Sequence, residues 1–135
     1  MCVAEGKRVR VVLDTSFLMI PGVFGVDVIS ELDRLLERHY ELLVPSPVLA
    51  ELERFASRGT SSERHAARIG IVLTKRAKVV RARAKADEAI LEIASKGDCV
   101  VATTDIALKK ELRRRGVPVV YLRQKSHLAL DGRVG

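Results

Sequence analysis

The chain has 135 residues, of which 47% are hydrophobic and 30% are charged, a balance typical of one globular domain and not of a disordered chain. Proline and glycine interrupt its longest apolar stretch, residues 17–26, so we expect no transmembrane segment and a cytoplasmic protein. Two widely separated cysteines, Cys2 and Cys99, argue against a disulfide framework and against a Cys-type zinc site.

The net charge of +7 is concentrated in one segment of the chain. Residues 54–86 contain ten basic residues and a single acid, Glu63. Such a concentration favours a polyanion as partner, because each Lys or Arg that reaches a phosphate releases counterions. A solvated helical face is the alternative explanation of the same charge.

Strand and helix signals alternate along the chain. The expected order is strand 9–13, helix 26–39, strand 42–44, helix 46–58, helix 60–74, strand 78–81, helix 84–95, strand 99–103, helix 105–115 and strand 119–122. This order predicts a mostly parallel five-stranded sheet with helices on both faces. We expect a single domain over residues 1–125, followed by a short C-terminal tail at 126–135.

Capping residues support two of these helices. Ser46 is expected as an N-cap with Pro47 at the first helical position. Thr60 and Glu63 have the spacing of a capping box. Glu63 is therefore expected to cap a helix and not to bind a ligand.

Four acidic residues each follow the end of an expected strand: Asp14, Glu51, Asp87 and Asp105. In a parallel sheet, ligands bind beyond the carboxyl ends of the strands, near the point where the strand order reverses. At about 100° per residue, Glu51 lies on the apolar side of helix 46–58, and Asp87 lies on the inward side of helix 84–95. We therefore expect the four carboxylates to converge.

Each acid also has an ordinary explanation. Asp105 could cap its helix, Asp14 could begin a turn, and Asp87 could stabilise a first helical turn. The inward Glu51 is the hardest to explain in this way. Two carboxylates roughly 4 Å apart repel by about 4 kcal/mol at an effective dielectric constant of about 20, so converging acids need a cation. Oxygen ligands without clustered His or Cys favour Mg²⁺ or Mn²⁺ over zinc.

Four ordered blocks of the sequence resemble the PIN-domain nucleases. They are VVLDTSFL at 11–18, VPSPVLAEL at 44–52, ADEAIL at 86–91 and VVATTD at 100–105. The likeness extends over about residues 8–125, and it implies a three-layer α/β/α sandwich. Segments 21–27 and 117–125 are more similar to the archaeal rRNA-processing branch of the family than to its VapC-type toxins.

The resemblance implies a role for each matching residue. Asp14, Glu51, Asp87 and Asp105 match the family's catalytic, metal-binding acids. Ser16 and Thr103 match hydroxyl positions that support the site, although many relatives have Asn in place of Ser16.

The function implied is a Mg²⁺- or Mn²⁺-dependent endoribonuclease that hydrolyses RNA phosphodiester bonds, in rRNA processing. A set of basic residues is expected to guide single-stranded or looped RNA to the acids. This set comprises Arg58, Arg64, Arg68, Lys75 and Arg76. Aromatic residues make up only 4% of the chain, so recognition of the RNA backbone should dominate over base stacking.

Other functions remain open. A VapC-type toxin would use the same chemistry and would have an antitoxin as partner, and a homodimer is a further expected assembly. A non-catalytic RNA-binding PIN protein is a third alternative, although all four acids are present. A phosphoacceptor receiver domain is disfavoured, because a single Asp14 follows the first strand and Arg81 closes the third.

Overall fold

The structure is a computed structural model and describes residues 8–134. Its strands are β1 (Val9–Leu13), β2 (Tyr40–Pro45), β3 (Lys78–Val80), β4 (Cys99–Ala102), β5 (Val119–Arg123) and β6 (His127–Asp131). Its helices are α1 (Thr15–Leu18), α2 (Ile20–Phe24), α3 (Val28–Leu36), α4 (Ser46–Arg58), α5 (Ser61–Thr74), α6 (Ala86–Ala94) and α7 (Ile106–Arg114).

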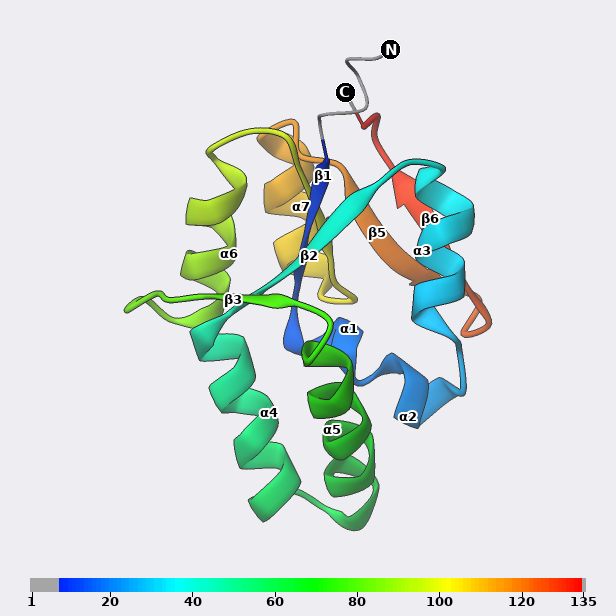
Figure 1. The fold of residues 1–135 in the computed structure, drawn as a ribbon, viewed down its shortest axis with the longest axis vertical. Helices are drawn as coiled ribbons and strands as arrows, with labels where there is room; N and C mark the ends of the chain where they lie inside the picture. Colours follow the sequence, from blue (N-terminus) through cyan, green and yellow to red (C-terminus); the bar gives the residue numbers. More distant parts are fainter. Residues whose placement is uncertain (1–7, 135) are drawn as a thin grey trace.

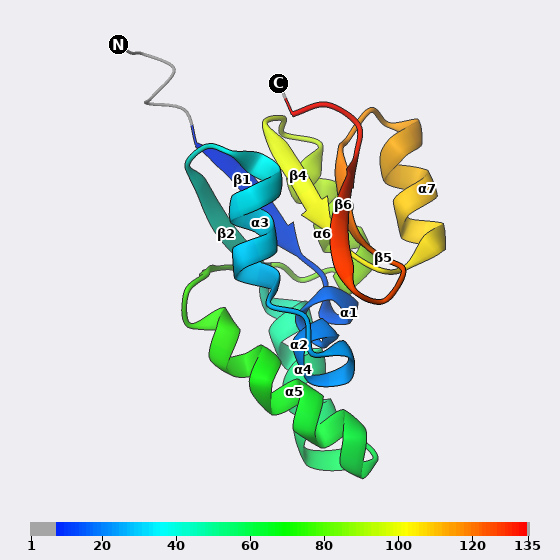
Figure 2. The ribbon, with the colours of Figure 1, turned by 90° about the vertical axis from the view of Figure 1, so that its right-hand side faces the viewer.

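The strands form one sheet in the order β3-β2-β1-β4-β5-β6. All neighbouring strands run parallel except β5 and β6, which are antiparallel. Helices α6 and α7 cover one face of the sheet, and α3 covers the other (Figure 1). Figure 2 looks onto the face that carries α3. The expected mostly parallel α/β/α sandwich is confirmed.

The core lies around the two central strands. Every residue of β4 is buried, and Val11, Val12 and Leu13 of β1 are at most 2% exposed. Strands covered by helices on both faces need a continuous apolar sequence, which these runs provide. The residues that follow β1 and β4 are therefore held by the best-packed part of the molecule.

The sheet has six strands and not the five expected. The sixth, β6, lies within residues 126–135, which the sequence pattern assigned to a tail. Three residues, 124–126, join β5 to β6, and the Ser126 N–H closes the turn by donating to the Arg123 carbonyl oxygen at 3.2 Å. Its central residues, Gln124 and Lys125, have φ angles of 53° and 57°. Two left-handed residues are the geometry of a type I′ hairpin turn.

Helix α3 is fastened to β6 by two side chains. Glu31 accepts a hydrogen bond from the Leu128 N–H through Oε1 at 2.9 Å. Arg34 donates from Nη2 to the Leu128 carbonyl oxygen, also at 2.9 Å, and pairs with Glu31. Both backbone groups of Leu128 are thus bound by α3.

The helices α1, α2, α4 and α5 gather beyond the carboxyl ends of the central strands (Figures 1 and 2). The sequence pattern did not predict α1 and α2, which form where Pro21 interrupts an apolar run. Small residues let α5 approach them closely. A Cβ atom on Gly22 would lie 2.4 Å from Cα of Ala66, and one on Gly70 would lie 2.8 Å from the Leu18 carbonyl oxygen. Larger residues at these two glycines would push the helices apart.

One of the two predicted caps is confirmed and the other is wrong. Thr60 and Glu63 form the expected capping box at the start of α5. The N-cap of α4 is Pro45, and Ser46 is already helical. The Ser46 hydroxyl instead accepts from the Ala82 N–H at 3.0 Å and donates to the Ala82 carbonyl oxygen at 3.2 Å. Ser46 therefore fastens the segment that follows β3.

No helix within residues 8–134 is long and apolar enough to cross a lipid bilayer. Cys99 is a buried free thiol, and its burial raises the pKa of the side chain. Cys2 lies outside the described residues.

Candidate active site

The site lies where the strand order reverses. From β1 the chain proceeds to β2 and β3 on one side, and later returns to β4 on the other side of β1. Asp14 directly follows β1 and Thr103 directly follows β4, so the two residues leave neighbouring parallel strands at the same edge. This edge is where ligands bind in open parallel sheets.

Asp14 is a buried carboxylate with hydrogen bonds to both oxygens. The residue is 6% exposed. Its Oδ1 accepts from the Thr15 N–H at 2.9 Å, and its Oδ2 accepts from the hydroxyls of Ser16 at 3.0 Å and Thr103 at 2.6 Å. Burial raises the pKa of Asp14, and these hydrogen bonds oppose the rise. The protein thus holds this carboxylate in one orientation at an electrostatic cost.

Ser16 and Thr103 join the β1 and β4 ends of the site. The Thr103 hydroxyl, which is fully buried, also accepts from the Asp105 N–H at 3.0 Å. The Ser16 hydroxyl accepts from the Thr104 N–H at 3.0 Å. Each hydroxyl therefore donates to Asp14 and accepts from the loop that leads into α7. The structure brings both expected supporting residues to the carboxylate.

Glu51 is half-buried on α4 and accepts a hydrogen bond from the Thr15 hydroxyl through Oε1. Thr15 itself is buried, at 7% exposure. The sequence reasoning missed Thr15 as a member of the site, although it lies inside a block that resembles the family. Only the folded chain shows the pairing, because the two residues are 36 positions apart.

Asp87 and Asp105 complete the acidic group from two helix N-termini. Asp87 is in the first turn of α6, and Asp105 caps α7 by accepting from the Leu108 N–H at 3.1 Å. Asp87, which was expected on the inward side of its helix, is exposed to solvent at the start of α6. Desolvation nevertheless raises the pKa of Asp87, and the charges of Asp14, Asp105 and Glu51 raise it further. The four carboxylates therefore share one electrostatic environment.

The chemistry of these groups suits a hard cation. All the converging side-chain donors are oxygens, which Mg²⁺ and Mn²⁺ prefer. The histidines lie on separate elements, His39 before β2, His65 on α5 and His127 on β6. Within residues 8–134, no three His, Cys, Asp or Glu side chains are already arranged to hold a metal ion. The acids are neighbours but would have to approach one another to chelate one.

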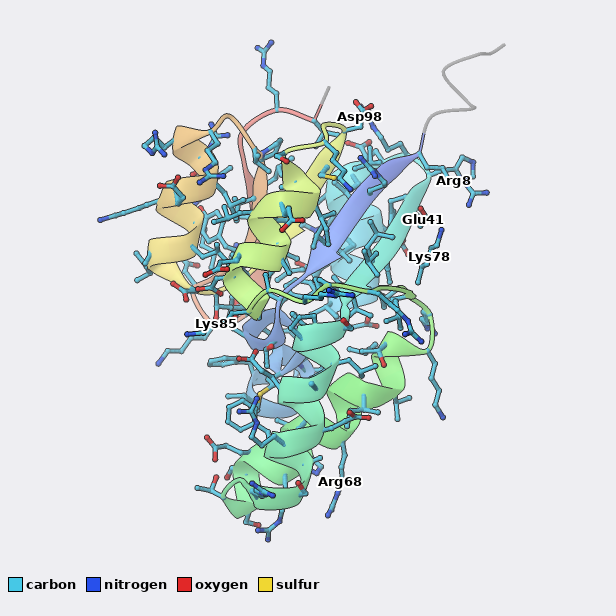
Figure 3. The ribbon with its side chains drawn as sticks, turned by 90° about the vertical axis from the view of Figure 1, so that its left-hand side faces the viewer. Arg8, Glu41, Arg68, Lys78, Lys85 and Asp98 are labelled. Atoms are coloured by element: carbon cyan, nitrogen blue, oxygen red, sulfur yellow. The ribbon has the colours of Figure 1, made fainter. Side chains whose placement is uncertain are left out.

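The five basic residues expected to bind RNA do not form one patch at this edge. Arg58 ends α4, Arg64 and Arg68 are on α5, and Lys75 and Arg76 follow it. Arg64 donates to the Gly59 carbonyl oxygen at 3.0 Å, which closes the loop between α4 and α5. Figure 3 shows Arg68 projecting from the helical hairpin, well away from Lys85 at the start of α6. Arg58, Arg64 and Arg68 therefore lie on the hairpin itself, and Lys75 and Arg76 lie where the chain returns from α5 to β3.

Comparisons with known proteins give a consistent result. A family model described as a PIN like domain matches residues 11–125. The chain is 34% identical over 129 residues to "Ribonuclease VapC4" of Methanocaldococcus jannaschii, covering 93% of this chain and 98% of the relative. It is 29% identical over 128 residues to "Ribonuclease VapC9" of Archaeoglobus fulgidus, covering 94% and 93%.

Solved structures share the fold. The PIN domain endonuclease Utp24 superposes with a TM-score of 0.75 at 23% identity, covering 93% of this chain and 92% of that one. A domain of a functionally unknown protein from Methanocaldococcus jannaschii superposes with a TM-score of 0.58 at 17% identity, covering 93% and 96%.

Proposed function

The chain belongs to the PIN-like domain family, and from this membership we propose that it is a metal-dependent endoribonuclease that hydrolyses phosphodiester bonds in RNA. One observation carries the proposal furthest. Asp14 is buried at the strand-order reversal, accepts three hydrogen bonds, and shares its environment with Glu51, Asp87 and Asp105. A fold gains nothing in stability from gathering four negative charges in this way, so a cationic ligand is the simplest reason for them.

The donor atoms of this site are oxygens, the kind of ligand that Mg²⁺ and Mn²⁺ prefer. We assign Asp14, Asp87 and Asp105 as direct ligands, and Glu51 as a ligand of a second ion or as the residue that positions the attacking water. When bound, such an ion supplies a water of lowered pKa and neutralises the charge that develops on the phosphate. Ser16 and Thr103 keep Asp14 in its binding orientation, and Thr15 does the same for Glu51. Positioning of this kind pre-organises the acids for the metal.

The basic hairpin would attract the substrate. Its cations Arg58, Arg68 and Lys75 are exposed and form no ion pair within residues 8–134. Positive charge on the hairpin would compensate, at longer range, the repulsion between the carboxylates and RNA phosphates. Single-stranded or looped RNA is the substrate class that we assign, because unpaired strands can follow an irregular surface.

Two biological settings suit this chemistry in the cytoplasm. Segments 21–27 and 117–125 favour rRNA processing, while the VapC names of two full-length relatives favour a toxin held by an antitoxin. Copurification distinguishes them. A small protein that is encoded beside this chain, binds it and blocks cleavage would establish the toxin setting. Copurification with pre-ribosomal particles would establish the other.

The nuclease proposal is tested by changes that remove charge but little volume. Asp14→Asn, Glu51→Gln and Asp87→Asn should each abolish Mn²⁺-dependent cleavage of a single-stranded RNA while leaving RNA binding largely intact. Glu53→Gln and Glu88→Gln serve as matched controls, because both residues are exposed neighbours of the acids, and these variants should remain active. If all five variants are purified identically, loss of cleavage in the three acid variants but not in the two controls excludes a contaminating nuclease. If the wild type binds RNA but cleaves none, or if Asp14→Asn still cleaves, the chain is a binding module.

A further inference from the structure

A groove of about 580 Å³ begins beside the acid site and runs along α7. Thr103 and Thr104 form its near end, and the loop that carries them is held to the site by the Ser16 hydroxyl. One side is a stripe of α7, with Ile106, Lys110 and Arg113 spaced at helical intervals. The other side is the end of β5 and β6. The volume is within the range of roughly 300–1,000 Å³ that is common for small-ligand sites.

The far wall of the groove is fixed by a charge cluster. Asp131 of β6 pairs with Lys109 at 3.5 Å and with Arg113 at 3.2 Å. The Lys109 ammonium also lies over the Tyr121 ring, 3.6 Å from its centroid. These contacts tie α7 to the edge of the sheet, and Lys109 covers one face of the Tyr121 ring. This wall carries two cations and one carboxylate, so a ligand in the groove meets a net positive charge.

Two residues of the groove are largely exposed to solvent. Ile106 is 73% exposed in the first turn of α7, next to the Asp105 cap. Lys110, one turn later, is exposed and forms no ion pair within the described part of the chain. A large apolar side chain and an unpaired cation on the same helical stripe match an RNA nucleotide, which has an apolar base face and a charged phosphate.

We propose that this groove binds an unpaired RNA nucleotide adjacent to the bond cleaved at the acid site. The inference rests on the proposed function, and it places the substrate strand along α7 as well as beside the helical hairpin. The base would lie against the aliphatic surfaces of Ile106 and Leu122, with its phosphate near Lys110. Three cations line the groove against one carboxylate, which suits a polyanion better than an apolar or cationic ligand.

A cavity of similar volume, about 590 Å³, lies at the opposite edge of the sheet. The C-cap residues of α6 and α7, Ser95 and Arg115, line it together with Arg8, Arg38 and Arg133. Its arginines would attract a phosphate, as the cations of the groove would. That cavity is remote from the acids, however, so it is not an alternative path for the strand being cleaved.

The test compares two double variants that each remove one lysine and trim one exposed aliphatic residue. Ile106→Ala/Lys110→Ala alters the groove, and Val23→Ala/Lys96→Ala alters two exposed residues that lie outside the groove and outside the basic segment 54–86. Binding of a fluorescent single-stranded RNA is measured in EDTA, and cleavage of the same RNA is measured in Mn²⁺. The groove variant should raise Kd and KM about tenfold with a smaller change in kcat. Its salt slope should fall by about 0.7, the value for one phosphate contact on a single strand. The Val23→Ala/Lys96→Ala variant should resemble the wild type.

Photo-crosslinking with RNA that contains 4-thiouridine gives a second measurement, which needs no variant. Crosslinks should map to α7 and β5 and not only to α5. The groove proposal is overturned if the wild type cleaves RNA but the groove variant matches it in Kd, KM and crosslink pattern. It is also overturned if the variant keeps RNA binding but loses a protein partner, since the groove would then be a protein-binding surface. A wild type that neither binds nor cleaves RNA would sink the nuclease proposal itself.

Discussion

The hydroxyl of Thr15 donates a hydrogen bond to Oε1 of Glu51, 36 positions later in the chain. Thr15 is buried, so its side chain is fixed by the packing at the end of β1. The contact couples an acid on α4 to the segment that directly follows the central strand β1, where Asp14 also lies. The position of Glu51 thus depends on a residue that carries no charge.

Replacing Thr15 by Val should therefore weaken cleavage without removing any acid. Residues that orient metal ligands typically contribute about 10–100-fold to activity or metal affinity. We expect a loss in that range, together with about 1 kcal/mol of lost stability from the missing hydrogen bond. Thr15→Ser keeps the hydroxyl and should retain most of the activity. Equal activity of the Val and Ser variants would show that this contact does not position Glu51.

The pH dependence of stability should reveal the buried carboxylate. Because the pKa of Asp14 is raised on folding, the folded chain binds more protons than the unfolded one above about pH 3.9, the ordinary value for Asp. In the metal-free protein, the stabilising contribution of Asp14 is fully present below that pH. It is lost as the pH rises through the pKa of Asp14 in the folded state. Denaturation in EDTA between pH 4 and 8 measures the change.

Asp14→Asn supplies the control, because other groups also titrate. Glu111, for example, has its pKa lowered to about 2 by hydrogen bonds from Arg114 and Arg115, then by their charges. The difference in the free energy of unfolding between wild type and variant isolates the contribution of Asp14. As the pH rises, the variant should become increasingly more stable than the wild type. A flat difference would mean that the carboxylate is not destabilising at neutral pH.

Divalent metal should remove this penalty. Mn²⁺ at 100 times its Kd would stabilise the folded wild type by about 2.7 kcal/mol, which raises Tm by several degrees. Melting in EDTA and in Mn²⁺ at constant ionic strength measures the shift. Asp14→Asn should lose most of it. An unchanged midpoint for the wild type would argue against metal binding at the acids.

The hairpin cations should contribute to RNA binding through charge alone. Replacing Arg58, Arg68 and Lys75 with Ala should weaken binding and reduce the salt slope by about 2, at roughly 0.7 per phosphate contact. Replacing Arg64 and Arg76 as well would be harder to interpret, because Arg64 also closes the α4–α5 loop. Removing three exposed cations at the opposite edge, Arg8, Lys96 and Arg133, provides the matched control. Equal salt slopes for the two triple variants would mean that the hairpin cations are only solvated and do not contact RNA phosphates.

A glycine in the turn between β5 and β6 should stabilise the protein. Lys125 has a φ of 57°, which costs a side-chain-bearing residue about 1 kcal/mol relative to glycine. Lys125→Gly should therefore stabilise the protein by up to about 1 kcal/mol in chemical denaturation. Arg123→Gly, in the adjacent strand, should destabilise it by a similar amount. A loss of stability in Lys125→Gly would mean that the lysine side chain makes a compensating contact.

Much of the fold was predictable because its signals are local. Strands β1 to β5 and helices α3 to α7 follow from apolar periodicity. The errors have physical causes. Helices α1 and α2 are too short for periodicity to appear, and proline interrupts their apolar run. Strand β6 depends on pairing with β5, which no local pattern reveals. Ser46 is a good N-cap residue, but its hydroxyl is used by the Ala82 backbone.

The site was predictable only in part. The acids could be identified because each follows a strand, and the strand-order reversal brings their helices together. Their individual surroundings could not be predicted. Asp87 lies in the first turn of its helix and is exposed there, which helical periodicity did not indicate. Thr15 and the groove beside Ile106 depend on which elements touch in three dimensions, and this information is absent from spacing along the chain.

The bonds from α3 to Leu128 have a consequence for the protein in concentrated solution. A strand at the margin of a sheet offers free N–H and C=O groups, to which a second molecule can add a strand of its own. On β6, Glu31 and Arg34 occupy both groups of Leu128, as a neighbouring strand would. At the other margin, β3 has only three residues and offers little length for pairing. Both margins are thus poor templates for intermolecular β-pairing, which protects the chain against aggregation through its sheet.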